Sequence, residues 1–548
     1  MAEAKTEWES LGGNNIDGIG GNAKKITYTA EDGTKKSLQI DCGMKFSIKE
    51  DTGYDSFIAP LECTDLLLTH AHADHIAGIV HHIQMHPEKP LNIIASPFTH
   101  KFLESELMKQ GLPLRHMPNF QDVNDGDVVD VNGFKVEVFG VTHSAPGSVG
   151  FMVESPDGTH LMDMGDFKTT PALLGTGWED KRIAEIFAKG VDVCFCDSTS
   201  TTSSEVTPSY EAVTEGFKKI LKDNPHSQLV VATIARSAQQ MTADVIAVAE
   251  YAKETGTKPK TFILDGSSLI AVDKALRDSG MSMEETVEKI TGVRVKIVDA
   301  KSSEAKNTPA SERIYMVTGT QGEEKASLAK LAMGTNKNVH PATDCPNLCV
   351  IQQAVIPAKG NQEAVDGVVQ GLKAQGFDVM LPERGAPFER GVTYYVSGHG
   401  RAGDMAVLAK LAKENSPADR PCTFIGQHGD EVQTQATETI FKAEGLTVAH
   451  MTNAQKVSVS KGKVSVSPTI GTATRIAVND KNNNFMAPDY EYVSQVFNPM
   501  SKQWEDRKTI DYTPVLQTGR GKGGKKGGKK GGRREINAAL VAKMGKAR

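Results

Sequence analysis

The sequence predicts an α/β protein that combines a layered domain with a second, more regularly alternating one. Apolar runs of strand length alternate with helix-length segments along most of the 548 residues, and this alternation is typical of α/β folds. Polar residues directly follow many of the apolar runs. Because α/β sheets carry their chemistry at strand ends, we expect one edge of the layered domain to hold a functional site.

The layered domain begins in residues 1–206. Its first two strands, 25–29 and 37–40, flank the turn Glu31-Asp32-Gly33 and therefore predict a hairpin. Later apolar runs predict further strands, and residues 97–109 predict a helix. The further strands are expected at residues 66–68, 92–95, 134–139, 149–154, 160–164 and 191–196.

Residues 207–387 predict a separate, doubly wound α/β domain, in which each strand is followed by a helix. Strand-end histidines return in residues 388–450, after the apolar runs 393–396 and 423–427. This order indicates that the doubly wound domain is an insertion into the layered domain. The strands of the inserted domain are expected at 228–232, 261–264, 313–317 and 348–352, and its helices at 239–252, 269–279, 325–333 and 362–375.

The C-terminal part of the chain changes character twice. Residues 451–518 predict a small region with a hairpin over 456–467 and irregular structure beyond it. Residues 519–548 contain eleven lysines and arginines and one acid, so their net charge is +10 and that of the remaining chain is −16. A Gly/Lys/Arg repeat cannot build a core. We therefore expect a disordered basic tail that binds RNA or DNA phosphates without sequence preference, or contacts the acidic body of the chain.

Composition places the chain among soluble globular proteins, with 39% hydrophobic and 24% charged residues. No apolar run approaches the roughly 18 residues of a transmembrane helix, so we expect no membrane partner. The polar, acidic N-terminus lacks the features of a signal peptide, which predicts a cytoplasmic location. Seven cysteines are scattered without a Cys-x-x-Cys pair, and this argues against a disulfide framework.

Residues 69–75 carry the densest group of possible metal ligands. His70, His72, Asp74 and His75 lie between a short apolar strand and the start of a helix. A lone histidine is more often a satisfied polar group, but four imidazole and carboxylate ligands so close together are specific for Zn²⁺ and, less exclusively, Mn²⁺ or iron. Side chains alternate in an extended loop, so His70 and His72 point the same way and the other two reach a neighbouring position. The spacing therefore suits two adjacent metal ions.

Further polar residues follow other strands of the layered domain and form short motifs. These are Asp41-Cys42-Gly43, His143, Gly165-Asp166-Phe167-Lys168, Cys196-Asp197-Ser198-Thr199, Ser397-Gly398-His399 and His428-Gly429. Together with residues 69–75, they resemble the metallo-β-lactamase fold and, within it, the β-CASP nucleases, most closely the ribonuclease J family. The resemblance spans about residues 11–429. It implies a metallo-β-lactamase αββα sandwich with an inserted doubly wound β-CASP domain.

The resemblance implies two divalent metal ions, zinc or manganese, held by the strand-end residues. Asp41 would accept a hydrogen bond from a ligand histidine and fix its tautomer. Asp74 would be both a ligand and a catalytic residue. By resemblance, the ligands would be His70, His72 and His143 for one ion, Asp74, His75 and His428 for the other, and Asp166 as the bridge.

The β-CASP motifs imply the remaining site roles. Asp197 would orient His399, which would contact the phosphate and donate a proton to the departing 3′ oxygen. Ser397 and Gly398 would bind a phosphate through hydroxyl and N–H groups. Arg236, in a segment that also resembles ribonuclease J, would bind the RNA backbone, although a single arginine is more often a surface or ion-pair residue.

The expected function is a metal-dependent ribonuclease that degrades RNA from the 5′ end, with possible internal cleavage, in RNA processing and decay. Histidine at position 428 favours RNA, since the DNA-repair members of the β-CASP group usually carry an apolar residue there. One alternative is a hydrolase of small esters or thioesters, which would not need Asp197, His399 or the insertion. Another is a non-catalytic RNA-binding scaffold. The resemblance also implies a homo-oligomer, either a dimer or a tetramer.

Overall fold

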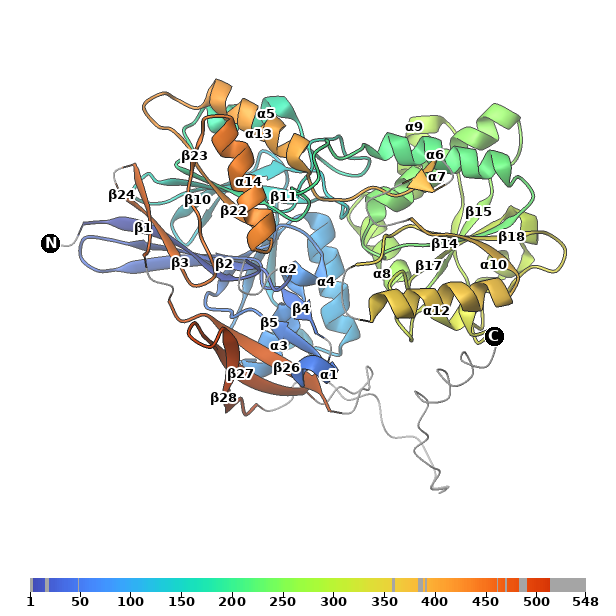
Figure 1. Ribbon diagram of the computed structural model, residues 1–548, viewed down its shortest axis with the longest axis horizontal. Helices are drawn as coiled ribbons and strands as arrows, with labels where there is room; N and C mark the ends of the chain where they lie inside the picture. Colours follow the sequence, from blue (N-terminus) through green and yellow to red (C-terminus); the bar gives the residue numbers. More distant parts are fainter. Residues whose placement is uncertain are drawn as a thin grey trace, which may run out of the picture.

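The chain folds into a larger lobe built around two facing sheets and a smaller lobe built around a third (Figure 1). The larger lobe contains both ends of the described chain, and the smaller lobe is formed by an internal segment. The predicted basic tail lies outside the described residues. The computed structural model describes residues 3–14, 19–47, 49–356, 360–382, 388–389, 392–460, 462–468, 471–481 and 490–512.

The first sheet of the larger lobe has eight described strands in the order β25-β24-β1-β2-β3-β6-β7-β8. The predicted hairpin is present as β2 and β3, with Ile26 opposite Leu38. Strands β3, β6, β7 and β8 are parallel, so their carboxyl ends meet at one edge. The bounds are β1 Lys5–Gly12, β2 Ala23–Thr29, β3 Lys35–Ile40, β6 Asp65–Leu67, β7 Asn92–Ala95, β8 Asn119–Asp122, β24 Lys456–Ser460 and β25 Lys463–Val466.

The second sheet has seven described strands in the order β23-β22-β13-β12-β11-β10-β9. Strands β12, β13 and β22 are parallel, so the residues that follow them share an edge as well. The bounds are β9 Val128–Val131, β10 Phe134–Gly140, β11 Val149–Glu154, β12 His160–Asp163, β13 Val193–Asp197, β22 Thr423–Gln427 and β23 Thr447–Val448.

A dry core joins the two sheets face to face. Trp8 of the first sheet stacks on Phe195 of the second, with ring centroids 3.8 Å apart and planes at 11°. Helices α2, α3 and α4 pack on the outer face of the first sheet, and α5, α13 and α14 on that of the second. This is the predicted αββα sandwich. The helices are α2 Ala73–Ile76, α3 Gly78–Met85, α4 Pro97–Lys109, α5 Asp180–Phe187, α13 Ala402–Asn415 and α14 Glu431–Ala443.

The smaller lobe is a six-stranded parallel sheet in the order β16-β15-β17-β14-β18-β19, with helices on both faces. The predicted doubly wound insertion and the predicted fold class are therefore confirmed. The predicted domain limits at residues 206, 387, 450 and 518 stay predictions. The elements are β14 Gln228–Ala232, β15 Thr261–Asp265, β16 Ile297–Asp299, β17 Arg313–Val317, β18 Asn347–Ile351, β19 Phe377–Met380, and α6 Tyr210–Asp223, α7 Ala238–Thr255, α8 Ser267–Asp278, α9 Met283–Thr291, α10 Ser303–Asn307, α11 Ser327–Ala332 and α12 Asn361–Ala374.

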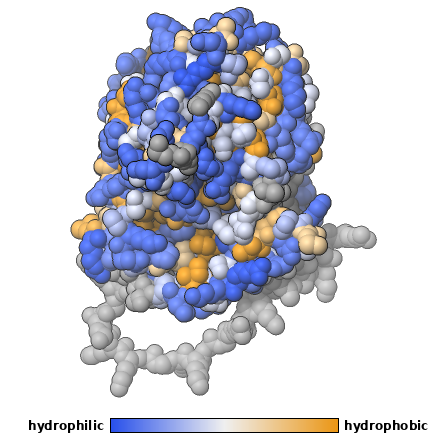
Figure 2. Space-filling view, turned by 90° about the vertical axis from the view of Figure 1, so that its left-hand side faces the viewer, coloured by the Kyte–Doolittle hydropathy of each residue, from blue (hydrophilic) through white to orange (hydrophobic). Residues whose placement is uncertain are grey.

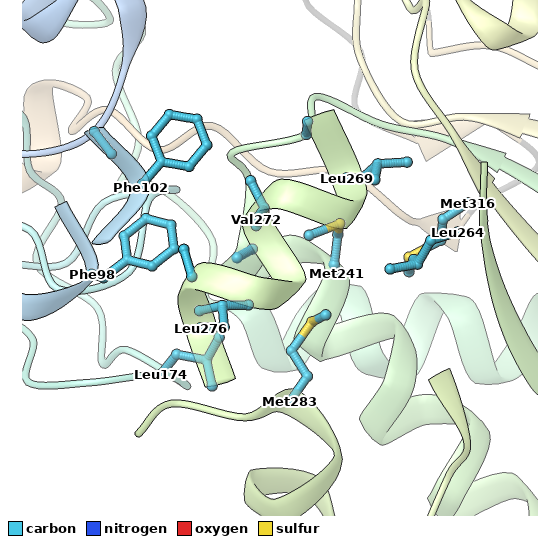
Figure 3. Packing of buried hydrophobic residues seen from close by; sticks show 14 of the residues in the cluster. Phe98, Phe102, Leu174, Met241, Leu264, Leu269, Val272, Leu276, Met283 and Met316 are labelled. Atoms are coloured by element: carbon cyan, nitrogen blue, oxygen red, sulfur yellow. The ribbon is translucent and has the colours of Figure 1, made fainter. Parts of the chain in front are cut away.

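One apolar cluster continues from the sandwich into the inserted domain. Phe98 and Phe102 of α4 face Val272 and Leu276 of α8 (Figure 3), and all four side chains are buried. Burying a side chain of this size is worth about 1.5–3 kcal/mol. The contact therefore fixes the loops of the inserted domain relative to the strand ends of the sandwich.

The region after β25 departs from the predicted irregular structure. Strands β26, β27 and β28 form an antiparallel sheet with β4 and β5 from the start of the chain. Tyr492 of β27 is buried there and shares a 3.0 Å hydrogen bond with Nδ1 of His81. The predicted hairpin over 456–467 is confirmed as β24 and β25. The bounds are β4 Met44–Phe46, β5 Ser56–Ile58, β26 Thr474–Asp480, β27 Tyr490–Asn498 and β28 Gln503–Thr509.

Hydrophilic residues dominate the face of the molecule shown in Figure 2, and its apolar residues lie in patches between them. Within the described residues, none of the helices combines the length and the apolar character that a membrane crossing requires. All seven cysteines are free. The remaining short elements are α1 Lys49–Thr52, β20 Phe388–Glu389, β21 Val392–Thr393 and two 3₁₀ turns, Leu114–His116 and Ala310–Glu312.

Candidate metal and catalytic site

The loops after several strands of the sandwich bring their polar side chains to one place. Parallel strands of both sheets end there, and the segment before α13 adds His399. The structure thus brings all seven predicted metal ligands together with Asp197 and His399. Within each of three groups, the potential ligand atoms lie within 4.8 Å of one another: His70, His72 and His143; Asp74, His75, Asp166 and His428; Asp166, Asp197, His399 and His428.

Three imidazoles of the first group converge on a point. Nδ1 of His72 lies 3.1 Å from Nε2 of His70 and 3.0 Å from Nε2 of His143. Burial lowers the pKa of His70 and His72 well below the ordinary value, and it lowers the pKa of His143 to about 4. All three rings are therefore neutral at pH 7 and present lone pairs, which are the donors that a divalent metal requires.

Asp166 lies between the two groups of histidines. Its Oδ2 is 3.2 Å from Nε2 of His75, 3.6 Å from Nε2 of His70 and 3.7 Å from Nε2 of His428. Burial opposes its ionisation, but His428 and His75 hold the pKa of Asp166 well below its usual range. Asp74 completes the second group, with Oδ2 3.1 Å from Nε2 of His428. A carboxylate that contacts both groups is placed to bridge two cations.

Asp41 and Thr69 orient two of the histidines. Oδ2 of Asp41 accepts a 2.8 Å hydrogen bond from Nδ1 of His75 and a 2.9 Å bond from the hydroxyl of Thr69. The same hydroxyl lies 3.1 Å from Nδ1 of His70. Since Nδ1 is engaged in each ring, Nε2 is left for a metal, which is the arrangement predicted for Asp41. Asp41 holds this position with a φ of 60°, an uncommon conformation that tertiary contacts must maintain.

Replacing Asp41 by asparagine is expected to weaken metal binding by about 10–100-fold, the usual cost of losing an outer-shell partner. The neutral amide no longer stabilises the His75 tautomer that offers Nε2. Titration of the metal-free chain with Zn²⁺ against a competing chelator measures the change. Asp32→Asn, at an exposed hairpin turn, is the matched control, and equal affinities of the two variants would contradict the role of Asp41.

Backbone and hydroxyl groups orient two further histidines. Nδ1 of His143 donates a 2.9 Å hydrogen bond to the carbonyl oxygen of Gly398. A Cβ on Gly398 would lie 2.8 Å from Nδ1 and Cε1 of His143, so this close approach requires glycine. Nδ1 of His428 lies 2.6 Å from Oγ1 of Thr199, whose hydroxyl donates to the His428 carbonyl. Both rings again keep Nε2 for the metal group.

Asp197 and His399 form a buried carboxylate–imidazole pair beside the metal group. Nδ1 of His399 lies 2.7 Å from Oδ2 of Asp197 and 3.9 Å from Oδ2 of Asp166. Burial is the largest single influence and lowers the pKa of His399, but Asp197 and Asp166 together outweigh it, so the net shift is upward. The ring is 22% exposed, whereas Asp197 is fully buried. The backbone N–H of His399 donates to Oγ of Ser397 at 3.1 Å, so that hydroxyl shapes the loop.

Arg236 brings the inserted domain to the rim of the site. It lies in the loop between β14 and α7, and its guanidinium sits over the Phe102 ring at 4.9 Å from the centroid. Burial lowers the pKa of Arg236, whereas Glu106 and Asp74 raise it. Burial outweighs the two carboxylates, so the net shift is downward.

Sequence reasoning missed several residues that support the ligands. Nδ2 of Asn22 lies 3.1 Å from Nε2 of His75 and donates to the Asp74 carbonyl at 3.1 Å. Asn22 ends the glycine-rich run 12–22, and an isolated asparagine carries no signal of such a role. Thr69 and Thr199 lie within the motifs named above. Thr69 directly precedes the ligand His70, and Thr199 follows Asp197 by two positions, so their place in the sequence could have indicated a supporting role.

The sandwich, the insertion and the site define a metallo-β-lactamase-fold protein of the β-CASP type. Residues 59–298 match the beta-lactamase superfamily domain and residues 267–372 match the ribonuclease J beta-CASP domain. Ribonuclease J of Sinorhizobium meliloti is 26% identical over 470 residues, 83% of this chain and 74% of that protein. Ribonuclease J 1 of Streptococcus pyogenes is 26% identical over 426 residues, 75% and 67% of the two chains. The chain is therefore similar to the ribonuclease J family over most of its length.

Proposed function

We propose that the chain is a metal-dependent ribonuclease that hydrolyses RNA phosphodiester bonds from the 5′ end and also internally. The observation that carries the proposal is the Asp197–His399 pair directly beside the predicted metal ligands, with His399 Nδ1 3.9 Å from Asp166 Oδ2. A hydrolase of small esters would need the metal ligands alone. The similarity to proteins named ribonuclease J supports RNA as the substrate.

The donor set fits two divalent cations, and we assign them as Zn²⁺ or Mn²⁺. Imidazole nitrogens and carboxylate oxygens converge, and in four of the rings a contact at Nδ1 turns Nε2 toward the other ligands. Such ions, when bound, acidify a water molecule and neutralise charge on the scissile phosphate. His70, His72 and His143 would hold one ion, Asp74, His75 and His428 the other, and Asp166 would bridge.

His399 and Asp197 handle the proton of the leaving group in this proposal. Asp197 holds Nδ1 of His399 and favours the imidazolium form, so Nε2 can donate to the departing 3′ oxygen. The side chain of Asp74 is 28% exposed, whereas that of His75 is fully buried.

Three groups are proposed to bind the RNA backbone. The guanidinium of Arg236 lies over the Phe102 ring, and this contact limits the rotamer freedom that the side chain would lose on binding a phosphate. Ser397 and Gly398 lie in the loop that carries His399, so a phosphate bound there would adjoin the proton donor. The contact between α4 and α8 packs the domain that carries Arg236 against the sandwich.

RNA labelled at its 5′ end and carrying either one or three 5′ phosphates tests the proposal. The chain is stripped of metal with a chelator and then assayed on this RNA with and without added Zn²⁺ or Mn²⁺. Hydrolysis of a small thioester is measured in parallel under the same conditions. We expect metal-dependent RNA cleavage and little thioester hydrolysis. Thioester hydrolysis without RNA cleavage would support the small-ester alternative, and RNA binding without cleavage in either metal would support the scaffold alternative.

Residues 519–548 are proposed to add non-specific affinity for nucleic acid. Their net charge of +10 opposes the acidic remainder of the chain. Deleting them is expected to weaken RNA binding at low salt and to leave turnover of a short oligonucleotide nearly intact, as measured by filter binding at two salt concentrations and by initial rates. A collapse of short-substrate turnover would instead make the tail part of the catalytic site.

The assembly is proposed to be a dimer or a tetramer. Light scattering after size-exclusion chromatography measures the mass directly, and a monomer at micromolar concentration would refute this assignment. The cytoplasmic location expected from the N-terminus stays a prediction.

A further inference from the structure

A cavity of about 690 Å³ lies within the inserted domain. Residues that follow β15, β16 and β17 line it, and none of the predicted metal or catalytic residues is among them. Its size falls within the range of about 300–1,000 Å³ that is typical of small-ligand sites. The cavity is therefore a second candidate site, separate from the metal group.

The topology of the sheet places this cavity where doubly wound domains bind ligands. Strands β15 and β17 are adjacent and parallel. The chain leaves β15 for α8 on one face of the sheet and leaves β17 for α11 on the other. Loops that diverge in this way open a crevice outside the carboxyl ends of the strands. Gly266 and Thr318, directly after the two strands, both line the cavity.

Hydrogen-bond donors gather on one wall of the cavity. Helix α8 begins there, and its N-cap residue Gly266, with a φ of 140°, has no side chain to cap the first turn. The N–H groups of such a turn lack helical partners and favour an anion. The exposed hydroxyls of Ser267 and Ser268 stand on the same wall.

Four lysines supply positive charge around the cavity: Lys301, Lys325, Lys330 and Lys337. All four are exposed. Among the described residues, no carboxylate lies within ion-pair distance of the ammonium groups of Lys301, Lys330 and Lys337. These charges are free to meet an anionic ligand.

The carboxylates on the cavity wall are already engaged. Asp265 accepts hydrogen bonds from Nδ2 of Asn336 at 2.9 Å, from Nδ2 of Asn338 at 2.7 Å and from the hydroxyl of Ser327. Asp299 accepts a 2.8 Å hydrogen bond from a backbone N–H of the next turn. With four lysines and two aspartates, the lining has a net charge of +2.

We propose that this cavity binds a small phosphate-bearing ligand of nucleotide size. The N-terminal turn of α8 and its two serines would receive the phosphate, and Lys301 and Lys330 would neutralise it. The site needs no metal and does not depend on the proposed catalytic activity.

Uridine 5′-monophosphate is the probe, and the full chain is kept free of metal by a chelator so that RNA is not cleaved. Calorimetry measures the affinity, and acetylation of lysines followed by mass spectrometry locates the site. The double variant Lys301→Ala/Lys330→Ala is compared with Lys289→Ala/Lys373→Ala, which removes two exposed lysines of the same domain outside the cavity.

We expect the nucleotide to protect Lys301 and Lys330 from acetylation in the wild-type chain, and uridine without phosphate to leave them reactive. The cavity variant should bind at least tenfold more weakly and the control variant normally. Equal affinity of the two variants, or no protection of these lysines, would overturn the proposal. Protection by a 5′-phosphorylated oligonucleotide but not by the mononucleotide would overturn the assignment of a small ligand.

Discussion

Asp166→Asn is expected to lower kcat/KM for RNA by more than the roughly 100-fold that loss of an outer-shell partner costs. Oδ2 of Asp166 lies 3.2–3.7 Å from Nε2 of His75, His70 and His428, so this single carboxylate serves both halves of the site. An amide keeps the shape of the side chain but removes the charge that would bridge two cations. Initial rates on 5′-labelled RNA measure the activity, and elemental analysis measures the bound metal.

The same substitution should change the protonation of the metal-free site. Burial lowers the pKa of His75, but Asp166, followed by Asp74 and Asp41, raises it to about 10. Removing Asp166 deletes the largest raising contribution, so His75 should lose its proton at lower pH, which NMR titration of the metal-free chain would detect. Asp130→Asn, at an exposed position of strand β9, is the matched control. Full activity and full metal content in Asp166→Asn would show that Asp166 is not the bridge.

The sequence could predict the metal group because its first four ligands are local. His70, His72, Asp74 and His75 belong to one loop, and the elements around them follow from apolar patterning. His428 is 354 residues from Asp74, yet its place at a strand end puts it on the same edge. Residues that follow the strands of a layered fold can therefore meet at one edge even when they are far apart in the sequence.

Other features depend on contacts that no local pattern encodes. Strand β26 pairs with β5, more than 400 residues earlier, so Ile476 finds its partner Ile58 only in the folded chain. Asn22 contacts Nε2 of His75 only in the folded chain, and no sequence motif marks the pair. The cavity of the inserted domain arises because neighbouring strands feed helices on opposite faces, and strand order is not readable from the alternation of elements.

His399→Gln is expected to lower RNA turnover by about 10²–10⁴-fold, the usual contribution of a general acid. Glutamine retains a polar side chain but cannot donate a proton as imidazolium does. Asp197→Asn should also slow turnover and, in addition, move the alkaline limb of the pH–rate profile to lower pH. Asp197 is the strongest cause that raises the pKa of His399, and without it the imidazolium is lost at a lower pH.

A substrate whose leaving group needs no proton separates this role from simple phosphate binding. Uridine 5′-(p-nitrophenyl phosphate) releases p-nitrophenolate in place of a 3′ oxygen, so a proton donor gives it little advantage. We expect His399→Gln to hydrolyse this ester at a rate close to that of the wild-type chain, with the same metal content. If the variant lost equal activity on both substrates, His399 would act by binding the phosphate. An unmoved pH profile in Asp197→Asn would lead to the same conclusion, because the 2.7 Å contact would then position the ring without setting its charge.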